Sequence, residues 1–230
     1  MTASELVALV RHLRPPFLED LASPEITAIL AGARLRRFLT NSIITNQGHP
    51  ASHIFMVLTG AVRSFFLTEG GQKLYLNWSP PGDMFGGMAL LSRPSAYLVS
   101  TEALKNSNTL VWERATIRIL AAQHPKLFDN ALSIASNYLN LSLATRVSLT
   151  CHTARQRLAL VLANLASGIG HEVPGGIELS VRNEELAAAA NITLFTASRI
   201  MSEWERSKMV KKTRGKVVVR SPEGLLLQEI

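Results

Sequence analysis

The sequence predicts an α+β protein with a β-rich N-terminal half, one long helix and a smaller C-terminal domain of helices and a hairpin. Three changes of pattern along the 230 residues predict this order. Short apolar runs between turn residues occupy 35–113, residues 126–150 contain no proline or glycine, and basic side chains concentrate near the end. We therefore expect three segments, at 1–124, 125–150 and 151–230.

The first segment is predicted to form a helix followed by an antiparallel β-roll of the jelly-roll type. Apolar spacing from Leu18 to Leu30 predicts the helix over 17–32. Apolar runs that end at glycine or proline turns predict a sandwich or barrel. Three such runs are Ile54–Leu58, Ala61–Leu67 and Lys73–Trp78.

Residues 125–150 are predicted to form one long helix with apolar side chains on more than one side. A helix of this kind must be buried from more than one direction. Packing against the β-roll and against a second copy of the chain meets this need, and a core helix of a monomer is the alternative. An alternating three-four spacing predicts the seam of a dimer: Ala131, Ile134, Tyr138, Leu141 and Thr145.

The pattern from 184 to 205 is typical of two short helices that cross at a tight turn. Ala187, Asn191 and Ala197 supply the small, turn-forming and apolar positions that such a pair requires. Thr193 is a suitable N-cap for the second helix. The opposite face of that helix presents Leu194, Phe195, Ser198, Arg199 and Ser202.

A basic hairpin is predicted over 209–219, with its turn at Arg214-Gly215. Between Arg199 and Arg220 there are eight basic and two acidic side chains, a net charge of +6, while the whole chain carries +7. Two crossed helices and a basic hairpin form the winged helix-turn-helix of DNA-binding proteins, whose second helix enters the major groove. The predicted DNA contacts are Thr193, Leu194, Phe195, Ser198, Arg199, Ser202, Lys211, Lys212, Arg214 and Lys216.

The chain resembles the Crp/Fnr family of bacterial regulators over nearly its whole length. The resemblance rests on Val57–Val62, Pro81–Gly86, Arg155–Ala159 and the two-helix pattern of 184–206. It implies a cyclic-nucleotide-binding-like β-roll, a homodimer formed by the long helix, and recognition of a pseudo-palindromic operator in double-stranded DNA. We therefore predict a DNA-binding transcription regulator that is not an enzyme, with DNA, a second copy and RNA polymerase as partners.

The resemblance implies an effector pocket, but its residues differ from those of two well-known kinds of sensor in the family. Cyclic-AMP-binding members carry Gly-Glu where this chain has Gly86-Gly87, and an Arg-Ser pair further along, where 95–100 contains no arginine. Oxygen sensors hold an iron–sulfur cluster with several cysteines, and this chain has only Cys151. We expect an effector of unknown identity, neither cyclic AMP nor an iron–sulfur cluster, near Gly86, Gly87, Met88, Tyr97, Leu98 and Ser142.

The DNA-contacting helix also departs from the family pattern. Oxygen sensors of the family show Glu-x-x-Ser-Arg, whereas Phe195 stands in the place of the glutamate before Ser198-Arg199. Arg199 is predicted to bind a guanine, while Phe195 and Leu194 contact thymine methyl groups. The alternative function is a ligand-binding β-roll whose helix-turn-helix binds a protein instead of DNA.

Other classes of protein are disfavoured by composition. No apolar run reaches the roughly 18 residues of a membrane span, and 1–14 do not form the pattern of a secretory signal. A single cysteine allows no intrachain disulfide and no cysteine-based metal site. We expect a cytoplasmic protein without a metal, and a redox role for Cys151 stays open.

Overall fold

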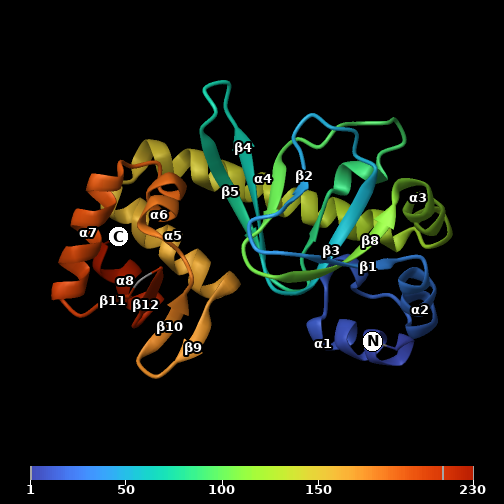
Figure 1. Ribbon diagram of the computed structural model, residues 1–230, viewed down its shortest axis with the longest axis horizontal. Coiled ribbons are helices and arrows are strands. Elements are labelled where there is room, and N and C mark those ends of the chain that lie inside the picture. The colour runs from blue at the N-terminus through green and yellow to red at the C-terminus, as the bar shows by residue number, and fades with distance from the viewer. Residues whose placement is uncertain (1, 214, 230) are drawn as a thin grey trace. The chain divides into compact units, whose positions relative to one another are not determined.

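The structure, a computed structural model, describes residues 2–213 and 215–229 (Figure 1). The chain divides into two compact units. The first comprises Met1–Lys73 and Ser79–Asn140, and the second comprises Leu74–Trp78 and Leu141–Ile230. The predicted order of a β-rich half, a long helix and a winged helix-turn-helix is confirmed.

The β-roll consists of two four-stranded sheets with the strand orders β1-β8-β3-β6 and β2-β7-β4-β5. The strands are β1 (Arg34–Phe38), β2 (Ile43–Thr45), β3 (His53–Thr59), β4 (Val62–Leu67), β5 (Lys73–Ser79), β6 (Met84–Phe85), β7 (Ser100–Ala103) and β8 (Ser107–Glu113). The predicted strands within 54–78 therefore correspond to β3, β4 and β5. The sequence did not predict β1 and β2 as separate strands.

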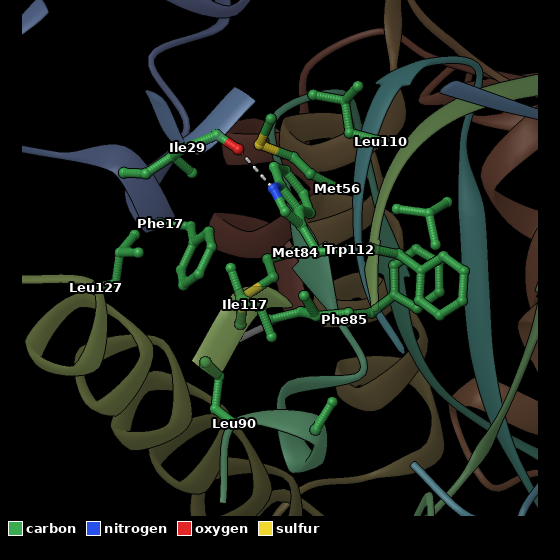
Figure 2. Packing of buried hydrophobic residues seen from close by; sticks show 14 of the residues in the cluster. Phe17, Ile29, Met56, Met84, Phe85, Leu90, Leu110, Trp112, Ile117 and Leu127 are labelled. Atoms are coloured by element: carbon green, nitrogen blue, oxygen red, sulfur yellow. Dashed lines mark hydrogen bonds between the residues drawn. The ribbon is translucent and has the colours of Figure 1, made fainter. Parts of the chain in front are cut away.

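The core of the first unit lies around β3 and β8 (Figure 2). Every side chain from Ile54 to Leu58 is buried, as a strand covered on both faces requires. Trp112 of β8 is fully buried, and its indole Nε1 donates to the carbonyl of Ile29 at 2.8 Å. Phe17 packs edge-on against the Trp112 ring. These contacts join the N-terminal helices to the sheet.

The helical elements before the DNA-binding domain number six. They are α1 (Ala3–Leu13), η1 (Pro16–Leu18), α2 (Ser23–Ala31), η2 (Gly87–Leu90), α3 (Arg114–Gln123) and α4 (Lys126–Cys151). The prediction of one helix over 17–32 is wrong, because the chain leaves η1 and begins α2 only at Ser23. Pro24 lies in the first turn of α2, the position where a helix tolerates a residue without an N–H.

The second unit contains the winged helix-turn-helix. Its elements after α4 are α5 (Ala154–Ile169), β9 (His171–Val173), β10 (Gly176–Leu179), α6 (Asn183–Ala189), α7 (Leu194–Arg206), β11 (Val210–Thr213), β12 (Lys216–Val219) and α8 (Pro222–Glu229). Its four strands form one sheet in the order β11-β12-β10-β9. The sequence analysis did not identify the β9–β10 hairpin. Leu158, Leu162, Ile200 and Trp204 are fully buried in its core.

Candidate nucleic-acid interface

The corner between α6 and α7 has the geometry that the sequence predicted. Asn191 adopts a left-handed backbone conformation with φ of 50°, which asparagine tolerates better than most residues. The Thr193 hydroxyl accepts a hydrogen bond from the Thr196 N–H at 3.1 Å and caps α7. Ala187 and Ala197 are buried where the helices meet. Small side chains at these two positions allow the close approach of α6 and α7.

One face of α7 is fixed in the domain core and the other faces solvent. Ala197, Ile200, Met201 and Trp204 are all fully buried. The opposite face carries the predicted contact residues. Among them, Phe195 is 78% exposed, and Arg199 is also exposed. The structure thus brings the predicted residues of α7 onto one surface. Whether they touch DNA stays a prediction.

Polar side chains on the exposed face of α7 are held by specific contacts. Ser202 donates to the Ser198 carbonyl at 2.8 Å and accepts from the Lys212 ammonium at 2.9 Å. Ser198 Oγ lies 3.4 Å from the Asn183 amide, which donates to it. Arg199 Nη1 donates to a carboxylate oxygen of Glu203 at 3.1 Å. These contacts hold the polar side chains of this face in defined positions.

The predicted wing is the hairpin of β11 and β12. Lys211 is exposed on β11, whereas the Lys212 ammonium lies 3.1 Å from a Glu205 carboxylate oxygen. The Lys212 backbone N–H also donates to Glu205, and these two contacts lower the pKa of the Glu205 carboxyl. Lys216 donates to Glu178 at 2.7 Å. Arg214, the fourth predicted basic residue of the wing, lies outside the described residues.

Arg157 of α5 connects the end of α4 to the corner between α6 and α7. Its Nη1 donates to the carbonyl of His152 at 2.8 Å, its Nε to the carbonyl of Ala190 at 2.9 Å, and its Nη2 to that of Asn191 at 3.3 Å. All three acceptors lie at or just beyond helix ends, where carbonyls lack partners within the helix. Arg157 therefore supplies three donors at two helix ends.

The long helix α4 has two distinct apolar faces. Ala131 and Ile134 pack against the core of the β-roll, and the Tyr138 hydroxyl donates to the Met84 carbonyl at 3.4 Å. These three residues of the predicted dimer seam are half-buried against their own chain, and whether the seam runs through them stays a prediction. Leu141 and Thr145, the other two seam residues, continue that face along the exposed part of α4.

A second apolar face of α4 is exposed and lies roughly a third of a turn away, given about 100° per residue. Its large members are Phe128, Leu132, Leu139 and Leu143. Leu132 is 71% exposed and Leu139 is 62% exposed. The sequence pattern did not separate the two faces, because both carry leucine, alanine or aromatic residues.

The predicted effector-pocket residues occupy different environments. Gly86 has φ of 79°, and a Cβ there would lie 2.8 Å from the His53 carbonyl oxygen, so this position requires glycine. Gly87 and Met88 begin η2 beside it and are half-buried. Leu98 is 66% exposed and points away from the core, and Ser142 is exposed on α4.

The hydroxyl of Tyr97 is engaged with the protein backbone. It accepts from the His53 N–H at 3.0 Å and donates to the His53 carbonyl at 2.9 Å. Burial raises the pKa of Tyr97. Two hydrogen bonds thus tie the Tyr97 hydroxyl to the backbone of His53 at the start of β3, and its role in an effector pocket stays a prediction.

A buried ion cluster lies between β4 and β7, and the sequence analysis did not identify it. Arg63 Nε donates to Glu102 Oε1 at 2.7 Å, and both side chains are almost completely buried. Lys73 Nζ lies 2.5 Å from Glu102 Oε2 and 4.2 Å from the centre of the Phe65 ring. Two cations thus share one carboxylate, and removal of either cation would leave one buried carboxylate oxygen without its ion-pair partner.

Metal-binding clusters and membrane-spanning helices are absent from residues 2–213 and 215–229. No group of three or more histidine, cysteine or acidic side chains there could hold a metal ion. No helix in that part of the chain is long and apolar enough to cross a membrane. Cys151 is exposed at the end of α4.

Two family models match separate parts of the chain. A cyclic nucleotide-binding domain model matches residues 35–124, and a Crp-like helix-turn-helix domain model matches residues 156–227. The first therefore covers the β-roll and the second covers the domain that carries α6 and α7. Both families and the relatives below are regulators or regulatory domains, not enzymes.

Relatives similar over most of the chain are bacterial regulators. The Cyclic AMP receptor protein of Thermus thermophilus is 28% identical, over 94% of this chain and 96% of the relative. Electron transport regulator A of Shewanella oneidensis is 23% identical, over 76% of this chain and 70% of the relative. The c-di-GMP responsive global regulator CLP of Xanthomonas campestris has the same fold, with a TM-score of 0.75 at 18% identity over 87% of this chain and 100% of that one.

Proposed function

The chain belongs to the Crp/Fnr family of transcription regulators, and from this we propose that it binds a pseudo-palindromic operator as a homodimer through α7. In this proposal residues 1–124 are the sensor, 125–150 the dimerisation helix and 151–230 the DNA-binding domain. DNA, a second copy and RNA polymerase are the proposed partners, in the cytoplasm.

The exposed face of α7 is the observation that carries the proposal. Phe195 and Arg199 project from a helix whose other side is fixed in the core. Arginine is the side chain that most often binds guanine O6 and N7 in the major groove, and Phe195 and Leu194 offer apolar contact to thymine methyl groups. The surrounding net charge of +6 over 199–220 favours a polyanion.

The wing is proposed to bind the phosphate backbone. Lys211 is exposed on β11, and Lys212, Arg214 and Lys216 belong to the same hairpin in sequence. Lys212 and Lys216 each already contact a carboxylate of the domain, so they neutralise less of the DNA charge than Lys211 does. We expect Lys211 to contribute more than Lys212 or Lys216 to the salt dependence of binding.

The dimer is proposed to form through the exposed apolar face of α4 that contains Leu132, Leu139 and Leu143. A contiguous apolar stripe on a helix that is already covered on another side is typical of a helix–helix interface. A two-fold dimer presents two copies of α7, so its operator should consist of two half-sites about one helical turn apart.

The effector is proposed to be something other than cyclic AMP. A bound phosphate must be compensated by a cation or several donors. Gly87 and Met88 offer no side-chain carboxylate for a ribose, Tyr97 is engaged with His53, and the cations Arg63 and Lys73 share Glu102. The name of the Thermus relative states its ligand, but at the corresponding positions this chain lacks the Gly-Glu and Arg-Ser pairs that cyclic-AMP-binding members of the family carry.

The test is an unbiased selection of binding sites from random duplex DNA, followed by titration of the selected site at several salt concentrations. We expect one palindromic sequence to be enriched. The logarithm of its binding constant should fall linearly with the logarithm of the salt concentration. The alternative, a helix-turn-helix that binds protein, predicts no enriched sequence and no duplex binding above the level of an unrelated basic protein of equal charge.

A further inference from the structure

Resting on the proposed base contact of Arg199, we propose that Glu203 and Arg155 position this arginine and thereby determine the sequence specificity of the protein. The three side chains form a chain of contacts from the domain core to the exposed face of α7. Arg155 lies on α5, and Glu203 lies one helical turn after Arg199 on α7.

The contact nearest the solvent in this series joins Arg199 and Glu203. Arg199 Nη1 donates to Glu203 Oε1 at 3.1 Å, and the arginine side chain is 57% exposed while the glutamate is half-buried. A long exposed arginine samples many rotamers, so a fixed partner lowers the entropy that binding must remove. The contact uses Nη1, which leaves the edge formed by Nε and Nη2 to donate two parallel hydrogen bonds to guanine.

The inner link joins Glu203 to Arg155. Arg155 Nη1 donates to Glu203 Oε2, so each carboxylate oxygen receives a different arginine. The Arg155 guanidinium carbon also lies 5.6 Å from the centre of the Trp204 ring, and Trp204 is fully buried. Arg155 is therefore held by the core, and it fixes the carboxylate that in turn orients Arg199.

Charge explains why Arg155 is needed as well as Glu203. A lone carboxylate beside the recognition surface would repel the phosphates of DNA and attract Arg199 away from the base. Two guanidinium groups around one carboxylate leave the cluster at a net charge of +1, so Glu203 can hold Arg199 without repelling the ligand. Lysine would not replace Arg155, because the ring contact and the planar geometry belong to the guanidinium group.

Two simpler roles make different predictions. An i,i+4 ion pair that only supports the helix contributes little to stability and none to base preference. A Glu203 that competes with the base would sharpen the base preference when it is removed. Positioning predicts the opposite, which is weaker preference at the one base pair that Arg199 contacts.

The experiment compares Glu203→Gln and Arg155→Met with the matched control Glu184→Gln in the full-length chain. Glu184 is exposed on α6 next to Arg182, at 3.9 Å, so its substitution also removes one negative charge from this domain. For each protein, affinity is measured for the selected operator and for operators with single base-pair changes. Circular dichroism establishes whether each variant is folded. If Arg155→Met does not fold, the isosteric variant Glu203→Gln still tests the proposal.

We expect Glu203→Gln and Arg155→Met each to lower discrimination at the Arg199 base pair by about three- to ten-fold, part of what a bidentate arginine–guanine contact provides. Glu184→Gln should strengthen binding to every sequence equally and leave discrimination unchanged. The double variant should lose no more discrimination than Glu203→Gln alone, because both residues act through one contact.

Outcomes that overturn this inference differ from those that overturn the proposed function. If Arg199→Ala abolishes discrimination while folded Glu203→Gln and Arg155→Met keep or sharpen it, the positioning role is refuted and DNA recognition by Arg199 stands. If the wild-type protein selects no sequence, or Arg199→Ala retains full discrimination, the proposed base contact itself fails.

Discussion

Asp83 is a half-buried carboxyl near Tyr138 of α4, and its replacement should change stability in a pH-dependent way. It lies close to Ser79 and Tyr138, and burial raises its pKa from 3.8 to about 6, although a hydrogen bond with Ser79 opposes the shift. Burial, and next the charge of Asp83, raises the pKa of Tyr138 to about 12. The fold thus favours the protonated form of Asp83.

The sign follows from linkage between protonation and folding. Because the folded state holds the proton more tightly, the stability that Asp83 contributes is complete below pH 3.8 and is lost as the pH rises to about 6. The difference between 3.8 and about 6 corresponds to roughly 3 kcal/mol, since each pH unit is worth about 1.4 kcal/mol. Asp83→Asn cannot ionise and escapes this loss.

We therefore expect Asp83→Asn to unfold at a higher urea concentration than wild type at pH 7.5. Its free energy of unfolding should be higher by up to about 3 kcal/mol, reduced by the cost of the altered hydrogen bond to Ser79. At pH 4 the advantage should shrink to about half a kcal/mol. Unfolding of the first unit can be followed by the NMR signals of β3, whose Val57 N–H donates to the Asp83 carbonyl. Glu69→Gln, at an exposed turn, is the control.

The physical reasoning would be refuted by a stability difference between Asp83→Asn and wild type that is the same at pH 4 and pH 7.5. Such a constant difference would mean that the substitution acts through shape or hydrogen bonding and not through ionisation. A carbon-13 titration that places the Asp83 pKa near 3.8 would refute the premise directly.

The other predictions concern binding and assembly. Arg199→Ala should cost about 1–3 kcal/mol on the selected operator and relax preference at one base pair per half-site, and unchanged preference in a titration would contradict its base contact. Lys211→Ala should lower the log–log salt slope by about one without altering sequence preference, whereas altered preference at constant slope would indicate a base contact. Leu139→Glu should break the dimer in sedimentation, because an unpaired carboxylate in an apolar seam costs several kcal/mol, while the control Asn137→Glu on the far side of α4 should leave it intact. Calorimetry with cyclic AMP should show no binding, and a micromolar dissociation constant would overturn the proposed effector class.

The helix-turn-helix could be predicted from sequence because its determinants are local. Ala187, Asn191, Thr193 and Ala197 lie within eleven residues, and their spacing alone specifies two helices and a turn. The helix α1 was not predicted, although Thr2 and Glu5 form a capping box at its start.

The parts that sequence did not provide depend on contacts between distant residues. Spacing could not choose the seam of α4, because it shows that a helix has apolar faces but not which of them its own chain covers. The Arg199–Glu203 pair is visible at i,i+4, whereas its anchor Arg155 lies 48 residues before Glu203. The burial of Glu102 between Arg63 and Lys73 likewise required the pairing of β4 with β7.

The three hydrogen bonds of Arg157 have a mechanical consequence. One guanidinium group binds the carbonyl of His152, immediately after α4, and the carbonyls of Ala190 and Asn191 at the turn before α7. If the last turn of α4 rotates, the short segment 151–153 therefore cannot take up the rotation by itself unless these hydrogen bonds break. As long as the three bonds are kept, we expect a rotation of the end of α4 to turn the corner between α6 and α7 with it.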